Sequence, residues 1–383
     1  MNIAIFTDSY SPQINGVVTQ IKNVSKELKK RGHNVLIVAP SENHKFRDET
    51  LAGLRVLFVG SVPLPTYDDY KITLPTSKRV KKILKEFNPD LVHVHTPFGI
   101  GWMGLRYARQ LKTPVIGTYH TLIPEFLMYL PIPFIKKSGF AKKVAWKYTN
   151  GFYNKCDVIT TPSIAMKKEL EKNGFNKIIV LPNAIDFKSF NAFAKKKYET
   201  KTPKLLYFGR VSFEKNIEVV IFALKHLLWK NHNLTLTITG SGPAVKYLKE
   251  IVKEEKLEKH VFFQKPLHEK DLAKHVASHD IFVTASTIET QGLTIAESMA
   301  TGIPCVGTDF LAIPDSIKEG KNGFLFAPFD FFHCAQKIEK LLKNPSLRKK
   351  MGKNGVEFAR KFSVNSIVTE TEELYAETIK SND

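Results

Sequence analysis

The chain has 383 residues, of which 43% are hydrophobic and 25% are charged. This composition excludes a disordered, collagenous or coiled-coil protein, and at about 150 residues per domain the length predicts two or three domains. The 57 basic and 37 acidic side chains leave a net charge of +20, which is the unusual feature of the composition.

Apolar runs short enough for buried strands alternate with helical patterns along the chain. In the first half, such runs lie at 3–6, 34–40, 91–95, 114–120, 158–160 and 178–182, with an amphipathic helix at 19–30. The cycle restarts with runs at 204–210, 234–240, 260–264, 280–286, 304–308 and 323–328, helices at 217–230, 244–256 and from residue 294, and a helical tail at 346–380. Apolar runs separated by helices are typical of parallel sheets with right-handed crossovers. The sequence therefore predicts an α/β protein with two Rossmann-like, doubly wound parallel sheets.

The restart places the division between the two sheets at the segment LPNAIDF, residues 181–187. We expect an N-terminal domain at 1–186, a C-terminal domain at 187–365, and a last helix at 366–383 that packs back on the N-terminal domain. Two doubly wound domains that face each other across a cleft place a site at the carboxyl ends of both sets of strands. The loops that follow the strands are therefore the first candidates for function.

Neither disulfides nor a membrane-spanning helix are indicated. Cys156, Cys305 and Cys334 are odd in number and far apart, so we expect a reducing compartment. No run of about 18 apolar residues is present, and the first residues are typical of a strand rather than a leader peptide. We expect an intracellular protein that is soluble or lies on a membrane surface.

Basic residues are concentrated in the first half, where residues 1–186 hold 27 basic against 14 acidic side chains. Segments 71–85 and 126–156 contain six basic residues each and no acidic ones, and the second is rich in large apolar side chains. Three interpretations are open: a face that lies on an anionic membrane, a solvated lysine face over an aromatic core, and an RNA-binding surface. The residues that we assign to membrane binding are Lys78, Arg79, Lys81, Lys82, Phe134, Lys136, Lys137, Phe140, Lys142, Lys143, Trp146 and Lys147.

Two loops at strand ends could bind an anionic ligand. The first is SYSPQINGVVT at 9–19, where Gly16 lets the backbone approach a ligand before a helix begins. It is not a G-x-G-x-x-G, and Gly16 taken alone is more often a turn residue than a functional one. The second is 209–216, in which Arg210 and Lys215 lead from a strand end into a helix N-terminus. Both cations could converge on one diphosphate there, or lie in a solvated loop.

A third loop, ETQGLTIAE at 289–297, carries the strongest signal. Gly292 and its neighbours form a turn whose amides, with the helix N-terminus that follows, can bind phosphate. Glu289 lies before the turn and Glu297 within the helix, so both carboxylates can accept hydrogen bonds from sugar hydroxyls. On spacing alone, Glu297 could equally be an acid on the helix surface.

Glu289 and Glu297, eight apart, match the E-x7-E signature of retaining GT-B glycosyltransferases of family 4, which the chain resembles from residue 1 to about residue 365. The sequence resembles the diacylglycerol glucosyltransferase subgroup, with Gln291 where many relatives carry an aromatic residue. The resemblance implies a GT-B fold with two domains that face across a cleft, and a nucleotide-sugar donor. The segments that carry it are FTDSYSPQINGVVT, PDLVHVHTPFGIG, YHTLIPEF, VLPNAID, ASTIETQGLTIAE and EGKNGFLF.

The family pattern implies a role for each matched residue. Arg210 and Lys215 would neutralise the donor diphosphate, and Gly16 would leave room for it from the other domain. Glu289 would hold a sugar hydroxyl, and Glu297 the ribose hydroxyls. His120 would face the transferred sugar. The amides of Gly292, Leu293 and Thr294 would lie near Glu289. The backbone of Phe263, Gln264 and Lys265 would contact the nucleotide base.

No D-x-D, HExxH or cysteine pair occurs in the sequence. A metal-held diphosphate is therefore not indicated, and a pair of cations is the natural substitute. We expect no metal and no cofactor besides the nucleotide-sugar donor. By family analogy, the diphosphate departs from the face that the acceptor attacks, and one of its oxygens helps to deprotonate the acceptor.

These observations favour transfer of glucose from UDP-glucose to a hydroxyl of a membrane lipid such as diacylglycerol. We expect a peripheral enzyme on the cytoplasmic face of the cell membrane, with no nucleic-acid partner. A different acceptor within the same family is also open: a phosphatidylinositol, a polyprenyl-linked sugar or a polysaccharide, with GDP-mannose as donor. More distant in function are a nucleotide-sugar 2-epimerase on the same fold and an RNA-binding protein that uses the charge alone.

Overall fold

The computed structural model describes residues 1–13, 15–64, 67–122, 139–267 and 269–382. It divides into two compact units: residues 1–184 with 364–383 form the first, and residues 185–363 form the second. No helix in the described ranges has the length and apolar character needed to cross a membrane.

An eight-stranded sheet forms the centre of the first unit, in the order β10-β9-β8-β7-β1-β2-β4-β3. Every neighbouring pair is parallel except β3 with β4, which is antiparallel. The strands are β1 (Asn2–Phe6), β2 (Asn34–Pro40), β3 (Arg47–Leu51), β4 (Leu54–Val59), β7 (Leu91–Val94), β8 (Val115–Thr118), β9 (Val158–Thr161) and β10 (Ile178–Val180).

The antiparallel strand β3 at this edge of the sheet was not predicted from the sequence. The sequence RDETL of β3 is polar and partly exposed, so no apolar run marks it as a strand. The short connection from β3 to β4 cannot hold a crossover helix, and it forces antiparallel pairing. A further hairpin, β5 (Ser61–Leu64) with β6 (Tyr67–Thr73), forms a separate two-stranded sheet that was also not predicted.

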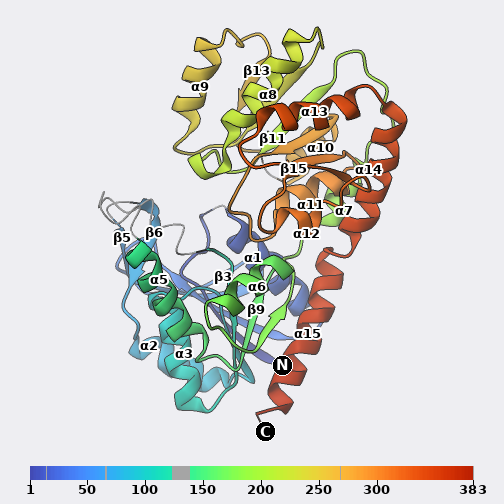
Figure 1. The fold of residues 1–383 in the computed structure, drawn as a ribbon. Coiled ribbons are helices and arrows are strands. Elements are labelled where there is room, and N and C mark those ends of the chain that lie inside the picture. The colour runs from blue at the N-terminus through green and yellow to red at the C-terminus, as the bar shows by residue number, and fades with distance from the viewer. Residues whose placement is uncertain (14, 65–66, 123–138, 268, 383) are drawn as a thin grey trace. The chain divides into compact units, whose positions relative to one another are not determined.

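Helix α1 (Gly16–Lys30) shows why the helices of the first unit form. Its residues Val18, Ile21, Val24 and Leu28 are three or four apart, so they share one face, and all four are buried. The last helix, α15 (Val364–Lys380), packs against α1 (Figure 1). The remaining helices of this unit are α2 (Lys78–Phe87), α3 (Gly99–Leu111), α5 (Gly139–Tyr153) and α6 (Ile164–Lys172).

The helical tail expected at 346–380 consists of two helices, and the sequence placed a last helix at 366–383. Helix α14 (Pro345–Arg360) belongs to the second unit, and α15 belongs to the first. Between them, Ser363 forms a β-bridge with Ile185, whose amide also donates to the Phe362 carbonyl at 2.8 Å. This tertiary pairing lies at the turn between α14 and α15, where the chain passes from the second unit to the first.

The second unit contains a six-stranded, wholly parallel sheet in the order β13-β12-β11-β14-β15-β16. The order reverses at β11 (Lys204–Phe208), which lies between β12 (Thr235–Thr239) and β14 (Ile281–Thr284). Such a reversal opens a crevice at the carboxyl ends of the strands. The other elements are β13 (Val261–Gln264), β15 (Cys305–Thr308), β16 (Gly323–Phe326), α7 (Phe187–Asn191), the 3-10 helix η2 (Phe213–Lys215), α8 (Ile217–Trp229), α9 (Val245–Glu254), α10 (Glu269–Ala277), α11 (Leu293–Ala300), α12 (Ile313–Ser316) and α13 (Phe331–Leu342).

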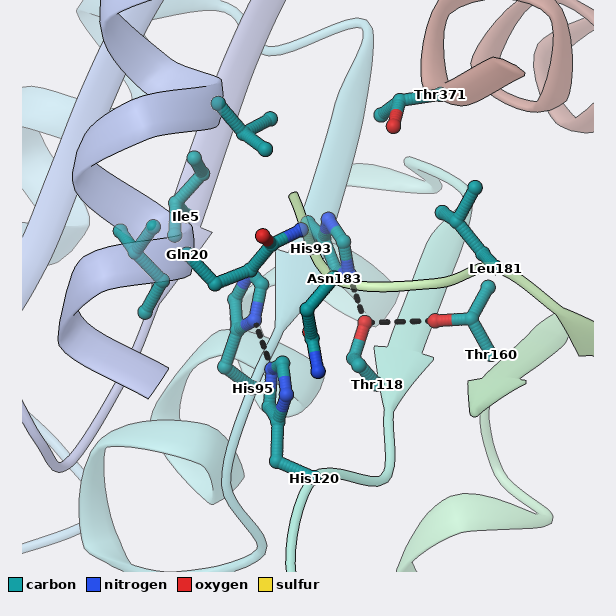
Figure 2. A pocket seen from close by; sticks show the side chains of 12 residues that line it. Ile5, Gln20, His93, His95, Thr118, His120, Thr160, Leu181, Asn183 and Thr371 are labelled. Atoms are coloured by element: carbon teal, nitrogen blue, oxygen red, sulfur yellow. Dashed lines mark hydrogen bonds between the residues drawn. The ribbon is translucent and has the colours of Figure 1, made fainter. Parts of the chain in front are cut away.

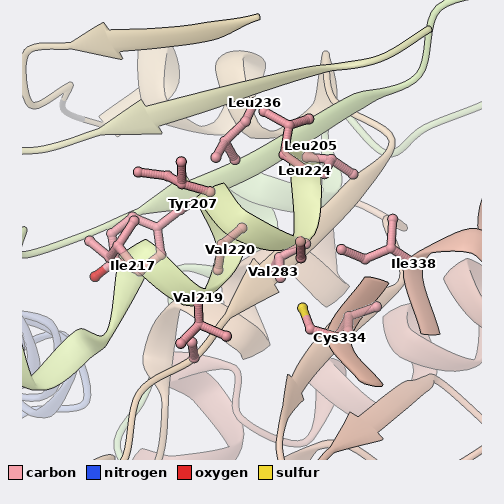
Figure 3. Packing of buried hydrophobic residues seen from close by; sticks show 14 of the residues in the cluster. Leu205, Tyr207, Ile217, Val219, Val220, Leu224, Leu236, Val283, Cys334 and Ile338 are labelled. Atoms are coloured by element: carbon pink, nitrogen blue, oxygen red, sulfur yellow. The ribbon is translucent and has the colours of Figure 1, made fainter. Parts of the chain in front are cut away.

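The core of the second unit lies around α8. Figure 3 shows Val220 and Leu224 of this helix packed with Leu205 of β11, Val283 of β14 and Ile338 of α13, all of them fully buried. Burial of such a side chain stabilises the fold by about 1.5–3 kcal/mol. This packing fixes β11 and β14 beside each other, and with them the loops that follow their carboxyl ends.

Candidate active site

The loops after β11 and β14 leave the same edge of the sheet, because the two strands are parallel neighbours. Gly209, directly after β11, has a φ of +129°, which only glycine adopts readily, and a β-carbon there would lie 3.5 Å from Cγ2 of Thr294. The structure therefore brings the predicted Arg210 loop and the predicted turn at 289–297 together.

Asn216 ties these two loops to each other. It adopts a left-handed conformation with a φ of +48°, which asparagine tolerates better than most residues. Its Nδ2 donates to the Ala285 carbonyl at 3.1 Å and contacts Oγ1 of Thr287 at 3.3 Å. We assigned no role to Asn216 from the sequence, although its position beside Lys215 at a strand end was the available signal.

Lys215 and Glu289 form a direct ion pair at the centre of this arrangement. The distance from Nζ of Lys215 to Oε1 of Glu289 is 2.7 Å, and Oγ of Ser286 lies 3.5 Å from the same Nζ. The side chains are only 16% and 19% exposed, so solvent weakens their attraction little. From the sequence, Lys215 was expected on the diphosphate and Glu289 on a sugar hydroxyl. The structure joins the two side chains, which lie where one ligand could contact both.

Arg210 is half-buried beside the same loop. Burial lowers the pKa of its guanidinium, and the attraction of Glu214 opposes that effect. Glu214 is itself buried and accepts a hydrogen bond from Oγ of Ser212 at 2.6 Å. The Tyr207 hydroxyl donates to the Arg210 carbonyl at 2.7 Å, so the backbone that carries the arginine is held in place.

Gly292 shapes the turn that opens α11. Its φ is +79°, and a β-carbon there would lie 2.8 Å from Cδ1 of Ile295, so a larger residue would be both strained and crowded. Leu293 and Thr294 form the first turn of α11. The first amides of a helix have no intrahelical acceptor and point at an anion placed before them. This geometry suits the phosphate-binding role predicted for all three residues.

Glu297 lies one turn further into α11. Burial, with a smaller contribution from repulsion by Asp186, raises the pKa of its carboxyl from 4.5 to about 8. Asp186 caps α7 by accepting from the Ser189 amide at 3.2 Å. The raised pKa favours the protonated carboxyl near neutral pH, and in that form Glu297 can donate as well as accept a hydrogen bond.

The residues predicted to read the base lie further along the sheet. Phe263 and Gln264 end β13, which β12 separates from β11, and Lys265 follows them. The Gln264 carbonyl accepts from the Gly240 amide at 2.9 Å, and Nζ of Lys249 lies 5.6 Å from the centre of the Phe263 ring. These residues are on the same sheet edge as Arg210 but two strands away from it.

Gly16 and His120 both lie in the first unit, whereas Arg210 belongs to the second. Gly16 is the exposed first residue of α1, and the Asn15 side chain caps that helix by accepting from the Val18 amide at 3.0 Å. His120 is buried two residues after the end of β8. Both residues therefore follow strands of the first sheet, as the sequence predicted.

His120 belongs to a cluster of three buried histidines (Figure 2). Nδ1 of His95 and Nε2 of His120 are 2.8 Å apart. His93 has both ring nitrogens engaged at 2.6 Å, Nδ1 with the Tyr375 hydroxyl and Nε2 with Oγ1 of Thr118. From the sequence, we assigned no role to His93 or His95. The available signal was their spacing, because residues two apart lie on the same face of a strand.

Burial disfavours the protonated form of all three imidazoles. Burial lowers the pKa of His93 to about 3 and that of His120 to about 4, although a hydrogen bond with the Asn183 side chain raises the latter. Burial also lowers the pKa of His95 well below its usual value. The cavity beside the cluster has a volume of about 20 Å³, which is room for about one water molecule.

The residues assigned to membrane binding are exposed to different degrees. Lys78, Arg79, Lys81 and Lys82 of α2 are exposed, and on α5 Phe140 is 76% exposed, with Lys143 and Lys147 exposed on the same face. Lys142 and Trp146 are half-buried, and Trp146 packs inward against Tyr119 and Phe175. The assigned residues that lie outside the described ranges are Phe134, Lys136 and Lys137.

No group of three or more histidine, cysteine, aspartate or glutamate side chains is placed to hold a metal ion within the part of the chain that the structure describes. The three cysteines are buried and unpaired.

Known proteins match both units. Residues 14–189 match Glycosyltransferase Family 4, and residues 188–358 match Glycosyl transferases group 1. An alpha-monoglucosyldiacylglycerol synthase of Streptococcus pneumoniae is 30% identical over 324 residues, covering 80% of this chain and 70% of that protein. A GDP-mannose-dependent alpha-mannosyltransferase of Corynebacterium glutamicum is 28% identical over 389 residues, covering 99% and 89%. A sucrose-phosphate synthase from Thermosynechococcus elongatus matches in structure with a TM-score of 0.77 at 18% identity, covering 99% of both chains.

The two α/β sheets with this structural match define a GT-B fold, and the two family matches define the class of the protein, a glycosyltransferase. The chain belongs to glycosyltransferase family 4, and it is a retaining glycosyltransferase. The predicted family, fold class and enzyme class are confirmed.

Proposed function

We propose that the enzyme transfers glucose from UDP-glucose to the hydroxyl of diacylglycerol and forms an α-glycolipid. The Streptococcus relative is named for the synthesis of such a lipid, which supports this acceptor. The observation that carries the proposal is the exposed face of α5, where Phe140 lies beside Lys143 and Lys147 without an acidic neighbour in 139–155.

That face would hold the enzyme on its acceptor. A basic helix with exposed apolar side chains lies in the interface of a bilayer, and each lysine near an anionic surface contributes about 1 kcal/mol. Exposed Leu74, which follows β6, and the basic residues of α2 in the same unit support the same assignment. The enzyme would then be peripheral, on the cytoplasmic face of the cell membrane, where its lipid acceptor lies.

The donor would occupy the strand-end loops of the second unit. Arg210 and Lys215 would neutralise the diphosphate, together with the amides of the turn at 292–294, and Glu289 would bind a sugar hydroxyl. Glu297 would contact the ribose hydroxyls. The backbone of 263–265 would contact the base. For Gly16 and His120 we propose the roles that the family pattern implies, Gly16 toward the diphosphate and His120 toward the transferred sugar.

Transfer would proceed with retention at the sugar C1. The bond from C1 to the diphosphate oxygen breaks, and a bond from C1 to the acceptor oxygen forms on the same face. The acceptor proton passes to an oxygen of the departing diphosphate. Lys215 and Arg210 stabilise the negative charge that develops there, so these two cations supply the role that a divalent ion would otherwise have.

A second function remains a candidate because of one observation. The Corynebacterium mannosyltransferase matches 99% of this chain, more than the Streptococcus glucosyl relative does. It favours a GDP-mannose donor and another acceptor, such as a phosphatidylinositol, a polyprenyl-linked sugar or a polysaccharide. A 2-epimerase on this fold would need no acceptor at all.

The test incubates the purified enzyme with UDP-glucose, GDP-mannose and other nucleotide sugars, with vesicles of total lipid extract, followed by mass spectrometry of new glycolipids. We expect a hexosyl-diacylglycerol from UDP-glucose, also in the presence of a chelator. A mannolipid from GDP-mannose would select the second candidate, and product formed without any lipid would select the epimerase.

Vesicle sedimentation tests the membrane face separately. Lys143→Glu with Lys147→Glu should abolish sedimentation with anionic vesicles and leave UDP binding intact, because both residues lie outside the donor loops. The matched control carries Lys196→Glu with Lys197→Glu, exposed lysines of the second unit with the same change of charge. Equal sedimentation of the two variants would contradict the assignment.

A further inference from the structure

We propose that His95 is a positioning residue for the sugar-transfer reaction, because its imidazole fixes both the orientation and the proton of His120. The inference rests on the proposed function, in which His120 faces the transferred sugar. His95 itself would touch neither substrate.

The geometry places the two rings in a fixed relation. His95 follows β7 directly, and His120 lies two residues after β8, the parallel neighbour of β7. Their ring centres are 5.1 Å apart and the ring planes differ by 12°, with the 2.8 Å contact between Nδ1 of His95 and Nε2 of His120 (Figure 2). Both residues are buried, so no bulk solvent competes for this bond.

The partners of the two rings determine where the protons lie. A hydrogen bond between two neutral imidazoles needs one proton, from either ring. Nε2 of His95 is buried and has no partner among the described residues. A proton on Nε2 would have no acceptor among these residues, whereas a proton on Nδ1 is donated within the protein. We therefore place the His95 proton on Nδ1, where it is donated to Nε2 of His120.

This choice leaves the proton of neutral His120 on Nδ1. A neutral His120 with its proton on Nδ1 can donate that proton to the side chain of Asn183, with which His120 forms a hydrogen bond. His95 and Asn183 thus hold His120 from two sides, as a neutral ring with one defined tautomer.

His93 prevents His95 from turning away. The two rings stack with centres 4.1 Å apart and planes 30° apart. His93 is itself fixed by the Tyr375 hydroxyl and by Thr118, whose Oγ1 continues the chain to Oγ1 of Thr160 at 2.6 Å. Since Tyr375 belongs to α15, this helix contacts the histidine cluster through the hydrogen bond between Tyr375 and His93.

The test uses two amides that replace different ring nitrogens. His95→Asn places its amide near the position of Nδ1 and keeps a donor for His120, whereas His95→Gln places it near Nε2 and loses that donor. We expect His95→Asn to keep kcat within about threefold of wild type and His95→Gln to lower it about 10–100-fold, since small misplacements at a reacting centre cost up to about 100-fold. The KM for UDP-glucose should change little in either variant. Equal kcat values for the two variants would overturn the inference.

NMR of ¹⁵N-labelled histidine provides a measurement that does not depend on activity. In the wild-type enzyme at pH 7, we expect His120 as the Nδ1–H tautomer. The spectrum should persist in His95→Asn and shift toward the other tautomer in His95→Gln. Finding His120 with its proton on Nε2 in the wild-type enzyme would overturn the inference even if both variants fold poorly.

The two proposals fail in different ways. If the wild-type enzyme transfers glucose to no lipid, the proposed function fails, while the NMR measurement still decides whether His95 sets the His120 tautomer. If the wild-type enzyme transfers glucose but His120→Ala has full activity, the positioning role fails and the proposed function stands.

Discussion

The replacement Lys215→Met tests the proposed diphosphate site most directly. It removes one cation and keeps a side chain of similar length, so the loop after β11 keeps its packing. Glu289 then loses its partner at 2.7 Å while remaining only 19% exposed. The change therefore affects both stability and catalysis, and the two effects can be separated.

The structure sets the size of each effect. At an effective dielectric constant near 20, two charges 2.7 Å apart attract by about 6 kcal/mol, most of which is offset by their desolvation. Since both side chains retain some solvent contact, we expect Lys215→Met to lower the free energy of unfolding by about 2 kcal/mol. Loss of a charge-stabilising donor costs about 100–1,000-fold in kcat, and that is the catalytic loss that we expect.

The assay measures glycolipid formation and urea unfolding for three variants. Lys215→Met should lose both activity and stability, whereas Lys215→Met with Glu289→Gln should regain stability without activity. The control Lys230→Met removes a cation that follows α8 and pairs with Glu339 at 3.1 Å, and it should keep full activity. A loss of less than tenfold for Lys215→Met would refute its role in stabilising the diphosphate.

Three further predictions concern donor binding and pH. The pKa of Glu297 is about 8, so UDP affinity should rise between pH 7 and 9 as the carboxylate forms. Because Asp186 raises that pKa, Asp186→Asn should move the midpoint of this rise to lower pH in calorimetric titrations. An unmoved midpoint would contradict the coupling between the two carboxyl groups. Gly16→Val should lower the transfer rate about 10–100-fold, because its side chain fills the space assigned to the diphosphate. The control Lys26→Val, at an exposed position of the same helix, should leave the rate unchanged. Equal rates for the two variants would exclude Gly16 from the site. Finally, the pKa of His120 is about 4 in the folded protein and near 6.5 when unfolded, so only the unfolded state takes up the proton between pH 7 and 5. The free energy of unfolding should therefore fall by about 2 kcal/mol over this range for this residue alone. A flat pH profile of the free energy from urea titrations would show that His120 is not buried as a neutral ring.

The elements that could be predicted from the sequence are those whose cause is local. The strands β1, β2, β11 and β14 are continuous apolar runs because both faces of a parallel sheet are buried. The spacing of Val18, Ile21 and Leu28 marks one face of α1. Arg210 and Lys215 are five residues apart in one loop, so chain proximity alone places them at one site.

The edge of the first sheet, and the residue at which the helical tail divides, could not be predicted in this way. The polar strand β3 is held by its pairing with β4, and the helical tail divides where Ser363 pairs with Ile185. Strand β3 has no apolar pattern of its own, and Ser363 pairs with a residue that is distant in sequence. Local propensity then carries no information about the outcome.

The sequence by itself determined the family, the two sheets and the chemical types of the residues at the strand ends. Only the tertiary structure decided which of these residues meet. Lys215 joins Glu289 across 74 residues, and His93 joins Tyr375 across 282. The first pair forms because parallel strands bring their carboxyl ends to one edge of the sheet. The second forms because helix α15 returns to the first unit. Burial then shifts the pKa values of the groups that these contacts enclose.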